Sequence, residues 1–165
     1  MQNHFRKTLL SLALFTLCAA HATQAQNLPY LQLIKQTATD GAANSEYGGA
    51  IAASESTKVV GARAHKVGTK ARQGAVYVYA KVGNGWGEPQ MLIANDGEAA
   101  DEFGTAVAVS GDMLVVGAPN HKVGNNAKQG AAYVFTRANG VWTFQQKLTA
   151  IDGAANDLFG AAVGI

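Results

Sequence analysis

Cysteine and charge are both scarce in this chain. The only cysteine among the 165 residues is Cys18, which lies close to the N-terminus. The rest of the chain therefore has no thiol that could form a disulfide, bind a metal or act as a nucleophile. Charged residues make up 15% of the sequence, which is low for a globular protein. We expect a fold that is stabilised by packing alone.

Proline is also rare, with three residues against 19 glycines. This ratio excludes a proline-rich disordered chain and a collagen-like chain, and it predicts many tight turns. The hydrophobic fraction of 48% is sufficient for a core, and the length fits one domain.

The N-terminal residues 1–25 have the composition of a signal peptide. Basic Arg6 and Lys7 precede an apolar run from Leu9 to Ala20, and small residues follow as far as Ala25. The apolar run is shorter than the roughly 20 residues that span a bilayer. We expect export to the cell envelope or the medium, and no transmembrane segment in the mature chain.

Removal of this leader changes the charge balance. The leader holds two of the 13 Lys and Arg residues and none of the 11 Asp and Glu residues. The remainder therefore carries 11 of each and has a formal charge of zero. A general attraction to nucleic acid is not expected.

The sequence repeats itself with a period of 56 residues. The pairs Asp40-Gly41, Asp96-Gly97 and Asp152-Gly153 are separated by this spacing, and the register then continues without a gap. "HKVG" occurs at His65 and again at His121. The repeat predicts a leading strand at 26–39, repeat 1 at 40–95, repeat 2 at 96–151 and a partial repeat 3 at 152–165.

Each repeat alternates with period two, which predicts strands. In repeat 2 the apolar runs 106–109 and 113–116 flank "SGD", and 131–137 and 142–149 flank "ANG", as in two hairpins. Four short antiparallel strands per unit fit a propeller blade. The predicted fold is all-β: a β-propeller-type repeat with two full four-stranded blades and a partial third, an incomplete propeller.

The motif "DEFGTAVAVSGDMLVVGAP" resembles the FG-GAP repeat of the integrin α-subunit propeller and of many exported bacterial proteins. Phe103-Gly104 corresponds to FG, and residues 117–119 to GAP. Repeat 1 has Tyr47-Gly48 and lacks the proline, since Arg63 follows Gly61-Ala62. The resemblance implies a propeller. We expect the aromatic residue to pack between blades and the glycines to be structural.

The family's calcium loop, D-x-D-x-D-G, has no counterpart here. The corresponding loops, "RAHKVGTKARQG" and "PNHKVGNNAKQG", contain no carboxylate, although calcium needs several oxygen ligands. No metal or cofactor is expected. The loops are basic instead and predict a surface for an anionic glycan or a protein partner. These candidate ligand-binding residues are Arg63, Lys66, Lys70, Arg72, Lys122 and Lys128.

No catalytic residue is predicted. His65 and His121 are expected to be loop residues without an acidic partner, and Trp86 and Trp142 to pack within the blades. The acidic turns around Asp96 and Asp152 more often bond their own backbone than a metal. The resemblance implies a non-enzymatic scaffold or adhesion-type binding module. The alternatives are the propeller part of a larger secreted enzyme whose catalytic residues lie outside this chain, and a purely structural fragment. We expect the chain to be a fragment of a longer product; the alternative is a short protein that self-associates through its open blade edges.

Overall fold

The structure, a computed structural model, describes residues 37–38, 40–41 and 43–165. The predictions for the signal peptide, for Cys18 and for most of the leading strand lie outside these residues. The described part of the chain is all-β and contains no helix, hence none that is long and apolar enough to cross a membrane.

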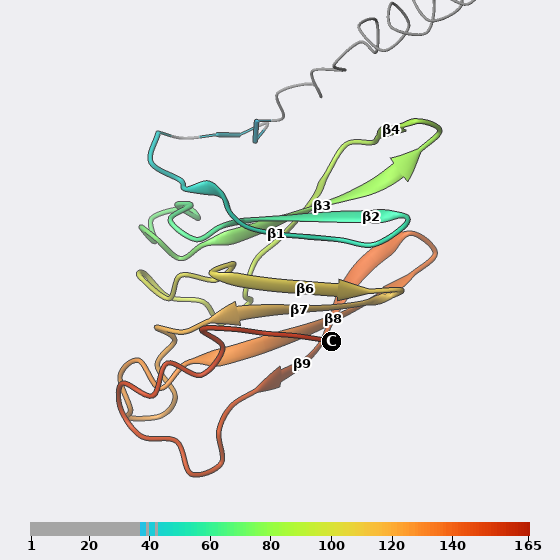
Figure 1. The fold of residues 1–165 in the computed structure, drawn as a ribbon. Helices are drawn as coiled ribbons and strands as arrows, with labels where there is room; N and C mark the ends of the chain where they lie inside the picture. Colours follow the sequence, from blue (N-terminus) through green and yellow to red (C-terminus); the bar gives the residue numbers. More distant parts are fainter. Residues whose placement is uncertain (1–36, 39, 42) are drawn as a thin grey trace, which may run out of the picture. The chain divides into compact units, whose positions relative to one another are not determined.

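Each repeat forms one antiparallel sheet whose strands follow one another in chain order (Figure 1). In repeat 1 the first three strands pair in succession, and the third strand then pairs with two short strands. In repeat 2 four strands pair in the order of the sequence. The strands are β1 (Tyr47–Ala53), β2 (Thr57–Ala62), β3 (Ala75–Val82), β4 (Gly85–Trp86), β5 (Gln90–Leu92), β6 (Ala106–Ser110), β7 (Met113–Ala118), β8 (Ala131–Ala138) and β9 (Val141–Leu148).

The fourth strand differs between the two repeats. In repeat 2 it is the continuous strand β9, whereas in repeat 1 it is divided into β4 and β5. The interruption falls at Gly87–Pro89, where proline cannot donate a hydrogen bond to a ladder. The expected four strands per unit are thus present, with this break in the first unit.

The two faces of each sheet have different neighbours. We call the face with Val59 and Val78 the forward face of repeat 1, and the opposite face, with Tyr77, its rear face; the counterparts 56 residues later define the faces of repeat 2. The forward face of repeat 1 and the rear face of repeat 2 share one core. Phe103 is fully buried in this core, which confirms that the FG aromatic packs between repeats.

The third copy starts like the others but forms no strand. Phe159 bridges Gly130 in parallel, just as Phe103 bridges Gly74. Residues 161–165 are not in a strand, so the partial repeat 3 lacks the first strand that repeats 1 and 2 contain. In repeats 1 and 2 that strand pairs with a second strand, and none is present beside residues 161–165.

Glycines let the repeats approach each other. A Cβ on Gly61 would lie 2.2 Å from the carbonyl oxygen of Gly104. One on Gly117 would lie 1.9 Å from the carbonyl oxygen of Gly160. Since real Cβ atoms do not come this close, the GAP glycine of one repeat provides room for the FG glycine of the next. The expectation that these glycines are structural is confirmed.

Candidate functional site: the loop end of the repeats

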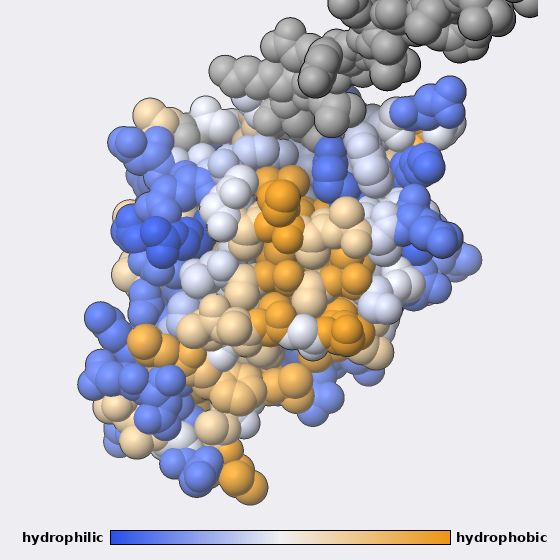
Figure 2. Space-filling view, in the orientation of Figure 1, coloured by the Kyte–Doolittle hydropathy of each residue, from blue (hydrophilic) through white to orange (hydrophobic). Residues whose placement is uncertain are grey.

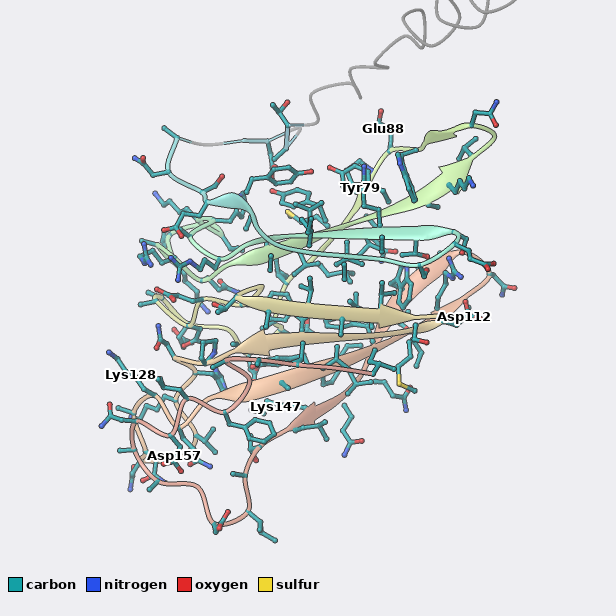
Figure 3. The ribbon with its side chains drawn as sticks, viewed as in Figure 1. Tyr79, Glu88, Asp112, Lys128, Lys147 and Asp157 are labelled. Atoms are coloured by element: carbon teal, nitrogen blue, oxygen red, sulfur yellow. The ribbon has the colours of Figure 1, made fainter. Side chains whose placement is uncertain are left out.

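The predicted basic loops lie at one end of the two sheets. They connect β2 to β3 and β7 to β8, and both emerge at the left in Figure 1. Figure 3 shows Lys128 at this end and Asp112, in the β6–β7 turn, at the other. We call the first of these the loop end.

Each of these loops is tied to the start of the following repeat. The amide nitrogens of Ala100, Glu102 and Phe103 donate to the carbonyl oxygens of residues 71–73 over 2.9 to 3.1 Å. Asn156, Leu158 and Phe159 make the same bonds to residues 127–129. The loop conformation is thereby fixed by backbone contacts that do not depend on its basic side chains.

Two of the predicted basic residues belong to an ion network. The Nε atom of Arg63 lies 2.5 Å from a carboxylate oxygen of Glu46, and an Nη atom of Arg72 lies 2.5 Å from Glu102. Two longer ion pairs link the same four side chains: Arg63 lies 3.8 Å from Glu102, and Arg72 lies 3.5 Å from Glu46. The hydrogen bond from Arg63 keeps the pKa of Glu46 below its usual value. Much of this positive charge is therefore neutralised within the protein.

Of the remaining four basic residues, one has polar partners, and the other three have no acidic partner among the described residues. Lys70 donates to the carbonyl oxygen of Gly97 over 2.6 Å and lies 3.3 Å from Glu98. Lys66, Lys122 and Lys128 are exposed and have no acidic partner among the described residues. These three lysines are what the loop end offers to a negatively charged ligand.

Both loop histidines are buried beside aspartates, contrary to our expectation. The Nε2 atom of His65 lies 3.5 Å from Asp40, and Tyr77 donates to the same carboxylate. His121 lies 2.7 Å from Asp101 through its Nδ1 atom and 3.7 Å from Asp96 through its Nε2 atom. The prediction failed because the partners are 20 and 25 residues apart in sequence. The common spacing of Asp40 to His65 and of Asp96 to His121 was the signal that could have revealed them.

The cluster in repeat 2 is more highly charged than its counterpart in repeat 1. Lys147 donates to Asp96 over 2.6 Å and lies 3.3 Å from the Nε2 atom of His121. Burial opposes the charged form of Asp96, but hydrogen bonds from Lys147 and Tyr133 outweigh it and hold the pKa of this carboxyl below its usual value. Burial and the bond to Asp96 raise the pKa of Tyr133.

These clusters are built to hold the fold together. Both ring nitrogens of His121 face groups of the protein, and its side chain is only 6% exposed. Asp101 also accepts a hydrogen bond from the amide of Glu98, which fixes the turn. Among the residues that the structure describes, no group of three or more acidic or histidine side chains is arranged to hold a metal ion.

The two tryptophans differ in burial. Trp142 is 5% exposed, and its main chain is bracketed by the side-chain amide of Gln90, which accepts from the Trp142 nitrogen over 2.9 Å and donates to its oxygen over 2.7 Å. The expected packing role is thus confirmed for Trp142. Trp86 is 39% exposed, and the Nζ atom of Lys58 lies 4.9 Å from its ring centroid. The expected packing role is therefore wrong for Trp86. No preceding repeat covers the rear face of repeat 1 among the described residues.

A family model identifies what this architecture is. The model of the FG-GAP repeat matches residues 30–79, 86–135 and 142–165. The chain belongs to the FG-GAP repeat family. The second matched segment begins at Trp86 in β4 and continues through the FG motif at 103–104 and the GAP motif at 117–119, so it spans the junction between repeats 1 and 2. No curated protein matches the chain.

Proposed function

We propose that this FG-GAP chain is an exported, non-catalytic binding module whose loop end contacts a protein or an anionic glycan. FG-GAP propeller repeats suggest a ligand-binding module, and the composition of residues 1–25 supports export. The observation that carries the proposal is the exposure of Lys66, Lys122 and Lys128 without an acidic partner in the described part of the chain.

The equivalence of the two loops supports a shared surface. Lys66 and Lys122 occupy the same position of successive repeats, and both loops emerge at the loop end (Figure 1). A ligand with regularly spaced negative charges, such as a sulfated glycan, would meet the same lysine in each repeat. Arg63 and Arg72 contribute less, because Glu46 and Glu102 already neutralise them.

The non-catalytic part of the proposal rests on the state of the candidate groups. His65 and His121 are buried against aspartates and have no serine, threonine or cysteine nucleophile among their hydrogen-bond partners. We therefore assign them to stability and not to chemistry.

Retention on immobilised heparin tests the proposal. We expect Lys66→Ala, Lys122→Ala and Lys128→Ala each to elute at lower salt than the parent, since exposed lysines act through long-range attraction that salt screens. Lys81→Ala is the matched control, because this exposed lysine lies at the end of β3 away from the loops. If all four variants elute together, or if the parent is not retained, the anionic-glycan assignment fails.

A further inference from the structure

A cavity of about 300 Å³ opens at the loop end of repeat 1. Its wall combines the β2–β3 loop with the segment that follows β5, so two parts of the repeat that are far apart in sequence meet there. The volume is at the lower end of the range for ligand pockets, which begins at roughly 300 Å³. The cavity is therefore large enough for one small ligand or for one unit of a polymer.

Gln73 brings an unpaired hydrogen-bond acceptor to this cavity. The residue is only 3% exposed, and its Nε2 atom donates to the carbonyl oxygen of Ala94 over 3.1 Å, which fixes the orientation of the amide. The Oε1 atom accepts no hydrogen bond from the residues that the structure describes. It is not sealed away from solvent either, so it is reached from the cavity that Gln73 lines. An acceptor in so buried a residue favours a ligand that brings a donor.

Repeat 2 supplies the donor for the same acceptor from within the protein. The counterpart of Gln73 is Gln129, whose Oε1 atom accepts from the side-chain amide of Asn126 over 3.0 Å. The same amide nitrogen donates to the carbonyl oxygen of Gly153 over 2.9 Å. The short asparagine side chain thus satisfies the acceptor that repeat 1 leaves open.

Repeat 1 has Lys70 where repeat 2 has Asn126. The ammonium of Lys70 donates to Gly97 over 2.6 Å and lies 3.3 Å from Glu98, but it makes no hydrogen bond to Gln73. An ammonium has three hydrogens to donate, so one remains for an oxygen in the cavity. Because Glu98 offsets the charge of Lys70, the cavity favours a polar ligand without net charge.

We propose that this cavity binds a neutral saccharide unit. One sugar hydroxyl donates to the Oε1 atom of Gln73 and accepts from Lys70, a double role that a carboxylate cannot fill because it has no hydrogen to donate. The carbon-bound hydrogens of the sugar ring contact Val67 and Ile93, which are partly buried in the cavity wall. Figure 2 shows that hydrophilic side chains gather at the loop end, at the left of the view, which suits the remaining hydroxyls of the ligand.

The inference extends the proposed function, since it takes the chain to be a binding module. It requires none of the three exposed lysines, Lys66, Lys122 and Lys128. Hydrogen bonds to a neutral sugar are also not screened by salt, whereas the attraction of exposed lysines to an anionic glycan is.

Nuclear magnetic resonance titration with the methyl glycosides of glucose, galactose and mannose tests the proposal. We expect at least one glycoside to shift the amide signals of residues 67–70 and the side-chain amide signals of Gln73. The signals of residues 123–126 and of Gln129 should stay unchanged, so that repeat 2 serves as an internal control. Equal shifts in the two repeats, or no shift with any of the three glycosides, overturn the proposal.

The variant Lys70→Asn gives repeat 1 the donor that Asn126 supplies in repeat 2. We expect it to weaken glycoside binding about tenfold or more without lowering the urea midpoint. The same replacement at an exposed lysine at the end of β3, Lys81→Asn, should leave glycoside binding unchanged. The proposal is overturned if Lys70→Asn keeps the affinity of the parent. It is also overturned if this variant unfolds at lower urea, since the asparagine then does not make the bond found in repeat 2.

The heparin experiment separates this inference from the proposed function. A parent that is retained on heparin but binds none of the glycosides contradicts the saccharide cavity alone. A parent that binds a glycoside at this cavity but is not retained on heparin supports the inference and contradicts only the anionic-glycan assignment.

Discussion

Two junctions in this molecule share one backbone plan and differ in side chains. Where repeat 1 meets repeat 2, a buried phenylalanine and the ion network of Glu46, Arg63, Arg72 and Glu102 reinforce the parallel bridge. Where repeat 2 meets the third copy, the same bridge and glycine contact recur, but Pro119 replaces the first arginine and Leu158 the second glutamate. The backbone contacts therefore define the repeat, and side-chain burial supplies most of the stability.

Replacement of the phenylalanines should give the largest difference in stability loss between the two junctions. We expect Phe103→Ala to lower the free energy of unfolding by about 4 kcal/mol, because it leaves a cavity in the shared core. Phe159→Ala should cost less than about 1 kcal/mol, since its ring is half-exposed. Urea titration followed by tryptophan fluorescence measures both values. Equal losses would show that the second junction is as well packed as the first.

Substitution of the glycines that contact the next repeat should give the next largest difference in stability loss. Gly61→Ala places a Cβ 2.2 Å from the oxygen of Gly104, which is fixed between two sheets, and should cost about 3 kcal/mol. Gly117→Ala meets Gly160, whose segment is held on one side only, and should cost about 1 kcal/mol. Gly124→Ala is the control: its Cβ meets open space at a φ of +57°, so it should cost only the left-handed penalty of about 1 kcal/mol. Thermal unfolding of the three variants tests this order.

The repeat, the sheets and the turns were predictable because they depend on local patterns. The 56-residue spacing located both units, and period-two alternation placed Tyr133 and Phe135 on one face of β8, where the structure has them. The division of the fourth strand in repeat 1 had a readable cause in Pro89 that the repeat pattern concealed. These features were predictable because each depends on residues that are close together in sequence.

The side-chain partners at the loop end were not predictable in the same way. The pairing of Arg72 with Glu102 crosses from one repeat to the next and depends on the parallel bridge at Gly74. The pairing of His121 with Asp101 needs the loop to fold back over β8. A count of basic residues therefore overestimated the free positive charge, because the glutamates that neutralise part of it belong to other segments.

Backbone strain offers a smaller test of the same comparison. Ala100 has a φ of 67°, and Asn44 and Asn156 occupy the equivalent positions at 66° and 71°. Asparagine tolerates this left-handed conformation better than alanine does. We expect Ala100→Asn to raise the free energy of unfolding by about 1 kcal/mol. The reverse change, Asn156→Ala, should be nearly silent in urea titration, because it lies in the weaker junction; a large loss there would contradict the comparison.

The smallest effect concerns acid stability and the charged cluster of repeat 2. The pKa of Asp96 is held below its usual value of 3.8, so its contribution is present above that pH and is lost as the pH falls through the lowered value. Lys147→Met reproduces Met91 of repeat 1 and removes the hydrogen bond that lowers this pKa, while burial, which raises it, remains. We expect a loss of about 0.5 kcal/mol at pH 7, because both partners are partly exposed.

The pH profile distinguishes this electrostatic loss from a packing defect. The difference in stability between Lys147→Met and the parent should close as the pH falls through the lowered pKa of Asp96, because this carboxyl is then protonated in both proteins. The reciprocal variant, Met91→Lys, places a lysine beside Asp40, which already accepts a hydrogen bond from Tyr77. It should give repeat 1 an acid-labile stabilisation of the same sign. A gap that persists at pH 2 would mean that the stem of Lys147, and not its charge, stabilises repeat 2.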